Sequence, residues 1–312
     1  MSSEPAVFVG TSGYSFKDWV GPFYPRGMAP VDQLPFYASH FNCVEVNTTY
    51  YGIPKPRVLA QMAVRTPERF RFVVKLNQAI THDRATDPLL FASFLDAVQP
   101  LKDAGKYHGI LAQFPWAFRR DDSSKRHLEI LRERLPGETL WIEFRHSSWM
   151  HPQLPDWLRE RNLGYCAVDE PAIESLVPPV THVTNGIGYV RFHGRNAQAW
   201  WKEKPGRARS GAGTASESQV AVEPQAEAEP QATLWPVPNA AEAAGPSPRA
   251  AQPGRYNYDY SESELAEWVK KVQALSQQAK QTYLFFNNCH AGQAARNAKL
   301  MEELLRRAGS LL

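Results

Sequence analysis

GYVRFHG, residues 188 to 194, is an apolar run that carries two basic side chains, Arg191 and His193, and ends in glycine. Side chains alternate between the two faces of a β-strand, so Arg191 and His193 share one face. An apolar run of this length that ends in polar groups is typical of a parallel strand buried on both faces, with its polar groups at the carboxyl edge of the sheet.

Runs of the same kind recur along the chain. Including this one, the predicted strands are 7–10, 44–46, 70–74, 109–112, 140–144, 165–168, 188–192 and 283–286. Apolar residues at helical spacing predict helices at 31–41, 89–101, 125–135, 264–275 and 294–305. Strands that alternate with amphipathic helices predict an α/β fold with a parallel sheet. About eight such units favour a single TIM-like (β/α)8 barrel over an open doubly wound sheet.

Residues 205–254 break this pattern. They consist largely of Ala, Pro, Gln, Glu, Gly and Ser, and EPQA occurs twice, at 223–226 and 229–232. Such a composition predicts a disordered low-complexity insertion in the loop after the seventh strand. We therefore expect one barrel domain over 1–312, formed by 1–204 and 255–312. A tolerated surface insertion is favoured over a mobile lid or a partner tether, for which the apolar island 234–237 is the candidate docking motif.

Composition restricts the class of protein. The 35 basic and 32 acidic residues nearly balance, so neither a membrane nor nucleic acid is favoured as a general partner, although a local basic site leaves nucleic acid open. Three widely spaced cysteines without a CxxC pair predict reduced thiols.

The N-terminus MSSEPAVFVG lacks the features of a signal peptide, and no apolar stretch is long enough to span a bilayer, so we expect a cytoplasmic protein. The sequence leaves the oligomeric state open.

Every predicted strand ends in a polar or titratable group, and pairs such as Glu143 and Arg145 share one face. If those faces point inward, the groups converge on the carboxyl mouth, where barrel enzymes perform their chemistry. The candidate catalytic residues are Glu45, Lys75, Glu143, Asp169 and His193, and the candidate substrate-binding residues are Asn47, Gln113, Arg145, Trp149, Arg191, Asn287 and Asn288. The alternative is a structural network in which the two glutamates neutralise Arg145, Arg191 and Lys75.

Seven motifs in order resemble the YecE-like family, domain of unknown function family 72. They are GTSGYSFKDWVGPFYP (10–25), FNCVEVNTTYYGIP (41–54), FVVKLNQAITHD (72–83), LAQFP (111–115), IEFRHSSW (142–149), YVRFHGRN (189–196) and FFNNCHAGQAARNA (285–298). The resemblance covers nearly the whole chain except the insertion, and this chain departs from the family pattern at Tyr50 and Cys289. It implies a TIM-type barrel and supplies no established reaction, so function has to be argued from the site.

Several chemistries compete at this mouth. Glu45 and Glu143 provide the two carboxylates of a glycosidase, but the ends of strands four and seven, where many barrel glycosidases place their acids, hold other residues. Lys75 ends an apolar run and suits a Schiff-base lyase, although a salt-bridged lysine is the favoured interpretation. No HxH or HExxH spacing supports a metal, so the cofactor is unknown, with a metal assembled from separate strands still open.

An anionic substrate has the best support. Arg145, Arg191 and Lys75 supply positive charge, and His193 is suited to acid–base work near neutral pH. We therefore predict an acid–base enzyme for a small phosphorylated or carboxylated substrate, with hydrolase, isomerase and lyase all open. The alternative is a non-catalytic binding module for an anionic ligand or single-stranded nucleic acid.

Overall fold

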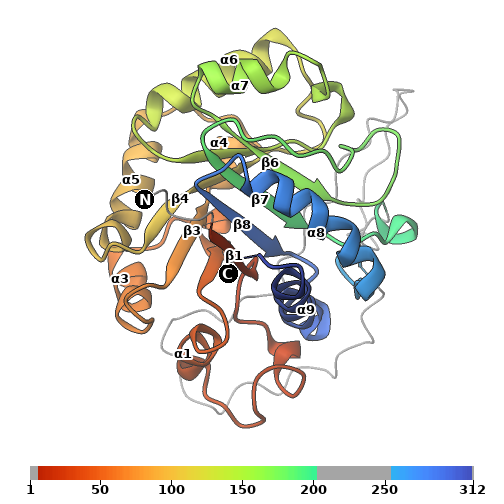
Figure 1. Ribbon diagram of the computed structural model, residues 1–312. Helices are drawn as coiled ribbons and strands as arrows, with labels where there is room; N and C mark the ends of the chain where they lie inside the picture. The colour runs from red at the N-terminus through yellow and green to blue at the C-terminus, as the bar shows by residue number, and fades with distance from the viewer. Residues whose placement is uncertain (1–5, 202–253, 311–312) are drawn as a thin grey trace, which may run out of the picture.

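The computed structural model describes residues 6–201 and 254–310, in which eight parallel strands form a barrel (Figure 1). The strands are β1 (Ala6–Thr11), β2 (Cys43–Val46), β3 (Arg71–Lys75), β4 (Tyr107–Gln113), β5 (Leu140–Glu143), β6 (Gly164–Asp169), β7 (Ile187–Phe192) and β8 (Gln281–Phe286). They pair in the order β1-β8-β7-β6-β5-β4-β3-β2. The predicted TIM-like barrel is thus confirmed, and the predicted insertion lies outside the described residues except for Gly254.

The barrel closes where β1 meets β2. A parallel bridge joins Ser12 to Glu45, and the backbones approach closely below it. A Cβ on Gly10 would lie 2.4 Å from the carbonyl oxygen of Cys43, so only glycine fits there.

A tyrosine completes the closure. The Tyr37 hydroxyl accepts a hydrogen bond from the Thr11 backbone N–H (3.0 Å) and donates one to the Cys43 carbonyl oxygen (3.0 Å). Tyr37 is fully buried. At Thr11 and Cys43 the two strands are therefore joined through the Tyr37 hydroxyl and not by a direct backbone hydrogen bond. The hydroxyl provides a hydrogen-bond partner for both buried backbone groups.

Helices surround the barrel. In the described part of the chain they are α1 (Gln33–Ala38), α2 (Thr48–Tyr51), α3 (Pro56–Val64), α4 (Gln78–Thr81), α5 (Pro88–Asp103), α6 (Asp122–Arg134), α7 (Leu154–Glu160), α8 (Glu262–Ser276) and α9 (Gln293–Arg307), with short 3-10 turns between some of them. Each predicted helix overlaps one of these, whereas α2, α3, α4 and α7 were not predicted. Helices α8 and α9 pack against each other outside β8 (Figure 1). No helix within 6–201 or 254–310 is long and apolar enough to cross a membrane.

The interior of the barrel is filled by side chains. At the amino-terminal end, Arg71 donates to Gln281 Oε1 and to the Tyr283 hydroxyl, each at 2.9 Å, and its guanidinium lies 3.7 Å from the centre of the Phe8 ring. Strand register then brings the inward residues of successive strands level with one another, for example Gln113 opposite Glu143. The carboxyl ends of the strands therefore present one compact set of polar groups at the mouth.

Candidate functional site

Four charged side chains from three strands form the centre of the mouth. Arg191 on β7 lies between two carboxylates, with Nη1 2.7 Å from Glu143 Oε2 and Nη2 2.7 Å from Glu45 Oε1. Arg145 Nε lies 2.6 Å from Glu143 Oε1. None of these side chains is more than 2% exposed, so the pairs are shielded from water.

Three further groups hold this arrangement in place. Tyr189 donates to Glu45 Oε2 at 2.7 Å, and Arg191 Nη2 donates to Ser12 Oγ at 3.2 Å. Arg145 Nη1 donates to Glu170 Oε2 at 3.0 Å. We call Glu45, Glu143, Arg145, Glu170 and Arg191 the charge cluster.

Glu143 is the most heavily coordinated member of the charge cluster. Burial acts to raise the pKa of its carboxyl group, but the positive fields of Arg145 and then Arg191 hold the pKa well below its usual range. Glu143 is therefore a carboxylate at neutral pH, and its role at the mouth is to fix the cations and the imidazole around it.

His193 is fixed as a neutral imidazole. Its Nε2 lies 3.1 Å from Glu143 Oε1, and its Nδ1 lies 3.1 Å from the Asn287 amide nitrogen. Burial and then the charge of Arg145 lower its pKa well below the usual value. Arg145 Nη2 also lies 3.1 Å from Nε2. When the Asn287 amide donates to Nδ1, the proton is on Nε2, which donates to Glu143, so the contact between Nε2 and Arg145 is then not a hydrogen bond.

Lys75 differs from every other cation at the mouth. Its side chain is 8% exposed, and its Nζ makes no hydrogen bond or ion pair with any residue in 6–201 or 254–310. Nζ lies 4.1 Å from the centre of the Tyr50 ring. Burial first, and then the charge of Arg191, lower the pKa of Lys75 to about 7. The expected salt-bridged lysine is therefore wrong for the described residues.

Two neighbouring amides complete the mouth. Val46 pairs with Val74, so continuing the register brings Asn47 beside Lys75. Asn47 Oδ1 is buried and accepts no hydrogen bond from the described residues. Gln113 is tied to its own loop, because its Nε2 donates to the Phe114 carbonyl oxygen at 2.8 Å.

Asp169 does not reach the mouth. It is the last residue of β6 and lies on the outer face of the barrel, where it accepts hydrogen bonds from Arg195, from the Tyr260 hydroxyl (2.7 Å) and from Trp268 Nε1 on α8 (2.5 Å). Glu170, one residue later, points inward instead. The reason is the alternation of side chains along a strand, which puts adjacent residues on opposite faces.

Two other candidates are also held away from the mouth. Asn288 donates to the Tyr258 carbonyl oxygen (2.8 Å) and to Asn297 Oδ1 on α9 (2.6 Å). Trp149 is 1% exposed and stacks in the core on Phe144, with 4.2 Å between ring centroids. Neither side chain faces the charge cluster, so both hold secondary structure together.

The mouth also contains residues that sequence reasoning missed. Glu170, Tyr189 and Tyr50 were not among the candidates, although each contacts one of them. Tyr189 lies two residues before Arg191 on the same strand, so alternation alone places it on the same face. Glu170 was missed because the apolar run 165–168 contains no charged residue that would show which face of the strand points inward. Tyr50 was missed because it lies on α2, beyond the end of β2.

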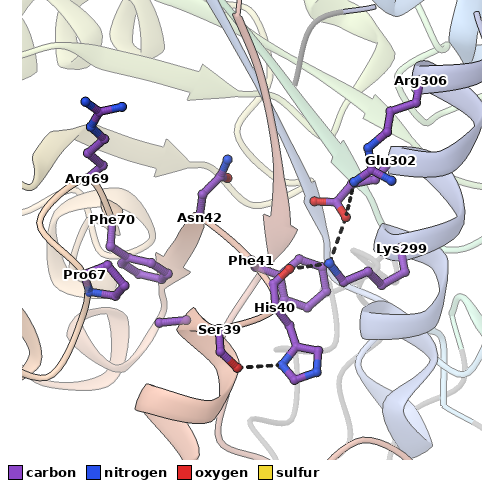
Figure 2. A pocket seen from close by; sticks show the side chains of 11 residues that line it. Ser39, His40, Phe41, Asn42, Pro67, Arg69, Phe70, Lys299, Glu302 and Arg306 are labelled. Carbon is purple, nitrogen blue, oxygen red and sulfur yellow. Dashed lines mark hydrogen bonds and ion pairs between the residues drawn. The ribbon is translucent and has the colours of Figure 1, made fainter.

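Neither a metal site nor a surface hollow in the described residues rivals the mouth. No group of three or more His, Cys, Asp or Glu side chains in 6–201 and 254–310 is placed to hold a metal ion. A surface hollow of about 320 Å³ lies between the segment before β2 and helix α9 (Figure 2). Two of its basic groups are already engaged, since Lys299 and Arg306 both contact Glu302. The mouth is therefore the stronger candidate.

Fold and site together define a TIM-type barrel protein with a buried charge cluster at its carboxyl mouth. The chain belongs to the family described as protein of unknown function DUF72, whose model matches residues 8–311. It is 29% identical to the UPF0759 protein YunF of Bacillus subtilis, over 96% of this chain and 94% of that protein. It is 30% identical to the UPF0759 protein YecE of Escherichia coli K12, over 54% of this chain and 59% of that protein.

Solved structures agree with this membership. A DUF72 family protein from Thermotoga maritima matches with a TM-score of 0.76 and 32% identity, covering 96% of this chain and 99% of that chain. A DUF72 family protein from Enterococcus faecalis matches with a TM-score of 0.72 and 28% identity, covering 96% and 95%. The predicted resemblance to the YecE-like family is thus confirmed.

Proposed function

We propose that the carboxyl mouth is the active centre of an acid–base enzyme for a small substrate that bears a carboxylate or phosphate. The observation that supports this proposal is Lys75, a buried amino group without an acceptor in the described residues. Its pKa of about 7 suits proton transfer at neutral pH, because a catalytic group works best when its pKa lies near the working pH.

The other mouth residues have supporting roles in this proposal. Glu143 keeps its charge, and both Glu143 and Glu45 contact the arginines and hold them in place. His193 is a neutral hydrogen-bond partner whose geometry Asn287 sets. Asn47 Oδ1 is free to accept a hydrogen bond from a substrate hydroxyl group. Proton transfer is thereby assigned to Lys75 in place of the glutamates.

The charge balance disfavours an anionic substrate unless Lys75 is protonated. The charge cluster holds three carboxylates and two guanidinium groups, so its formal charge is 2 − 3 = −1. A protonated Lys75 brings the total to zero, and an anion beside it then favours the ammonium form. Binding of the substrate is therefore expected to be coupled to proton uptake by Lys75.

A thermal-shift screen tests this proposal. Phosphorylated and carboxylated metabolites are compared with uncharged analogues at pH 7, using wild type, Lys75→Met, Lys75→Arg and the surface control Lys125→Met. We expect an anionic metabolite to raise the melting temperature of wild type, Lys125→Met and Lys75→Arg. We expect no such rise for Lys75→Met. Equal shifts in wild type and Lys75→Met would overturn the proposal.

Proton uptake and turnover complete the test. Calorimetry of the stabilising metabolite in two buffers of different ionisation enthalpy measures protons taken up, which we expect for wild type at pH 8 and not for Lys75→Arg. Product analysis then distinguishes an enzyme from a module that binds without turnover. No observation favours the nucleic-acid alternative, because Arg145 and Arg191 are at most 2% exposed.

We also propose the cytoplasm as the compartment of the protein. Cys43 and Cys166 are free thiols, which is usual in a reducing compartment. Fractionation of cells that produce the full chain checks this, and recovery outside the cytoplasmic fraction would contradict it.

A further inference from the structure

Two lysines are buried to the same degree, but their surroundings differ. Lys106 is 7% exposed, and its Nζ donates to the carbonyl oxygens of Ala63 (2.5 Å) and Thr66 (2.7 Å) and to Thr66 Oγ1 (3.2 Å). Its three N–H groups therefore all have acceptors, as a buried ammonium requires. Lys75 is 8% exposed and has none among the described residues.

A buried amine in the surroundings of Lys75 is favoured over a buried ammonium. Desolvation penalises the charged form, and the guanidinium groups of Arg191 and Arg145 add to that penalty. The Tyr50 ring face and the negative fields of Glu143 and Glu45 favour the cation, but burial and the two arginines outweigh them and lower the pKa to about 7. A neutral lysine has a free lone pair on nitrogen, so it is a nucleophile at neutral pH.

We infer that Lys75 is the nucleophile of this site and forms a Schiff base with the carbonyl carbon of an aldehyde or ketone substrate that also carries a carboxylate or phosphate. This inference rests on the proposed function and names its substrate class. It assigns to Lys75 a covalent role in addition to proton transfer.

The step balances without an oxidant or a reductant. The Lys75 nitrogen forms a bond to the carbonyl carbon, and one proton moves from nitrogen to oxygen to give a carbinolamine. A second proton, taken from solvent at the mouth, lets the oxygen leave as water while the nitrogen lone pair forms the C=N bond. His82 is excluded as its source, because burial and then the charge of Lys75 lower the pKa of His82 to about 3.

The charge cluster favours the cation that this step creates. A protonated Schiff base keeps a positive charge on nitrogen, and the cluster, with its net formal charge of −1, then becomes neutral as a whole. Asn47 Oδ1, buried and without a partner in the described residues, directly follows Val46, the strand neighbour of Val74, and is the acceptor that we assign to the carbinolamine hydroxyl. These two features stabilise the product and the intermediate, respectively.

Reductive trapping tests the inference. Full-length protein at pH 7 is incubated separately with pyruvate, glyoxylate and dihydroxyacetone phosphate, reduced with cyanoborohydride, digested, and analysed by peptide mass spectrometry. We expect at least one probe to label Lys75 about tenfold or more above the surface lysine Lys125, because a lysine of ordinary pKa is almost wholly protonated at pH 7. Lys106 serves as the buried control and is expected to stay unlabelled.

The outcomes separate the inference from the function on which it rests. Labelling spread evenly over surface lysines, or no labelling of Lys75 by any of the three probes, overturns the Schiff base. If the anion-dependent thermal shift persists in that case, Lys75 is an acid–base group only. If Lys75 is labelled but no anion stabilises the protein, the covalent role stands and the anionic preference is wrong. Lys75→Arg keeps the charge and should abolish the adduct.

Discussion

Glu143 and Lys75 face the same mouth, yet burial has opposite consequences for their charges. Glu143 touches Arg145 and Arg191, and these contacts outweigh the cost of desolvation. Lys75 lacks any such partner in the described chain, so desolvation decides its state. Whether a buried group keeps its charge therefore depends on its direct contacts more than on its depth.

A pH dependence of stability follows from Lys75. Its pKa is about 7 in the folded state and near 10.5 in the unfolded chain, so the unfolded chain binds more protons between these values. The free energy of unfolding therefore rises with pH across this window. We expect Lys75→Met to be more stable than wild type at pH 6 by about 2–4 kcal/mol, with the difference vanishing towards pH 10.

Denaturant unfolding from pH 6 to pH 10 measures this difference. Lys125→Met is the control, since its side chain is 30% exposed and should give a difference from wild type that does not change with pH. A pH-independent difference for Lys75→Met would show that Lys75 does not titrate in this range.

The tautomer of His193 depends on Asn287. In Asn287→Asp an acceptor replaces the amide donor, so Nδ1 gains a proton while Glu143 still accepts from Nε2. We expect the His193 pKa to rise and the imidazolium form to appear at neutral pH, as measured by imidazole nitrogen chemical shifts. Asn288→Asp, on the opposite face of the strand, should leave His193 neutral. Identical spectra for the two variants would contradict this assignment.

At the scale of elements, β1 and β2 form the weakest join of the barrel. Between them the described structure has a bridge at Ser12 and Glu45 and the bridging hydroxyl of Tyr37. Glycine at position 10 is what lets the two backbones approach. Two substitutions probe this join independently.

Gly10→Ala tests the close approach. Its Cβ would meet the Cys43 carbonyl oxygen at 2.4 Å, so we expect a loss of roughly 1–3 kcal/mol in the free energy of unfolding. Gly52→Ala is the control, because no atom lies within 4 Å of a Cβ there and its φ of −167° suits alanine. That variant should stay within about 0.5 kcal/mol of wild type. Equal losses would refute the steric argument.

Tyr37→Phe tests the bridging hydroxyl. Removing it leaves the Thr11 N–H and the Cys43 carbonyl buried without a partner, so we expect a loss of about 2 kcal/mol or more. Tyr107→Phe removes one bond to the carboxylate of Glu138, which keeps its ion pair with Lys102, and should cost less than Tyr37→Phe. Chemical unfolding compares the two, and a smaller loss for Tyr37→Phe would be inconsistent with closure through its hydroxyl.

At the scale of the whole molecule, the charge cluster joins strands from opposite sides of the barrel. Arg191 on β7 contacts Glu45 on β2 and Glu143 on β5, so one side chain links three strands that are not neighbours. The mouth is thereby rigid before any ligand arrives. A preorganised mouth suits binding of a small substrate, because little ordering is required on association.

Glu143→Gln is expected to destabilise the whole barrel. The change leaves Arg145 and Arg191 buried with too few carboxylates, which costs about 3–5 kcal/mol. Glu129→Gln removes a partly exposed partner of Arg161 and should cost less than about 1 kcal/mol. Thermal or chemical unfolding compares the two variants. Similar losses of stability would mean that the charge cluster stabilises the fold no more than a surface ion pair does.

Much of this protein could be predicted from its sequence. The eight strands, five of the helices and the pairing of charges such as Glu143 with Arg145 follow from local periodicity, which adjacent residues determine. Helices α2, α3, α4 and α7 were missed because they are short, with four, nine, four and seven residues, and have few apolar positions to establish a period. The inward direction of β5 and β7 was predictable, since each has charged residues two apart within an apolar run.

For β6 and β8, only the tertiary structure decided which of the polar residues at the strand end faces the mouth. In β6 and β8 both faces are buried and apolar, so the sequence does not distinguish Asp169 from Glu170 or Asn287 from Asn288. Pairing with β7 fixes that choice, because a shift of one residue would reverse every side chain. The same is true of Lys75. Its sequence predicts burial at a strand end, whereas its lack of an acceptor depends on side chains contributed by other strands.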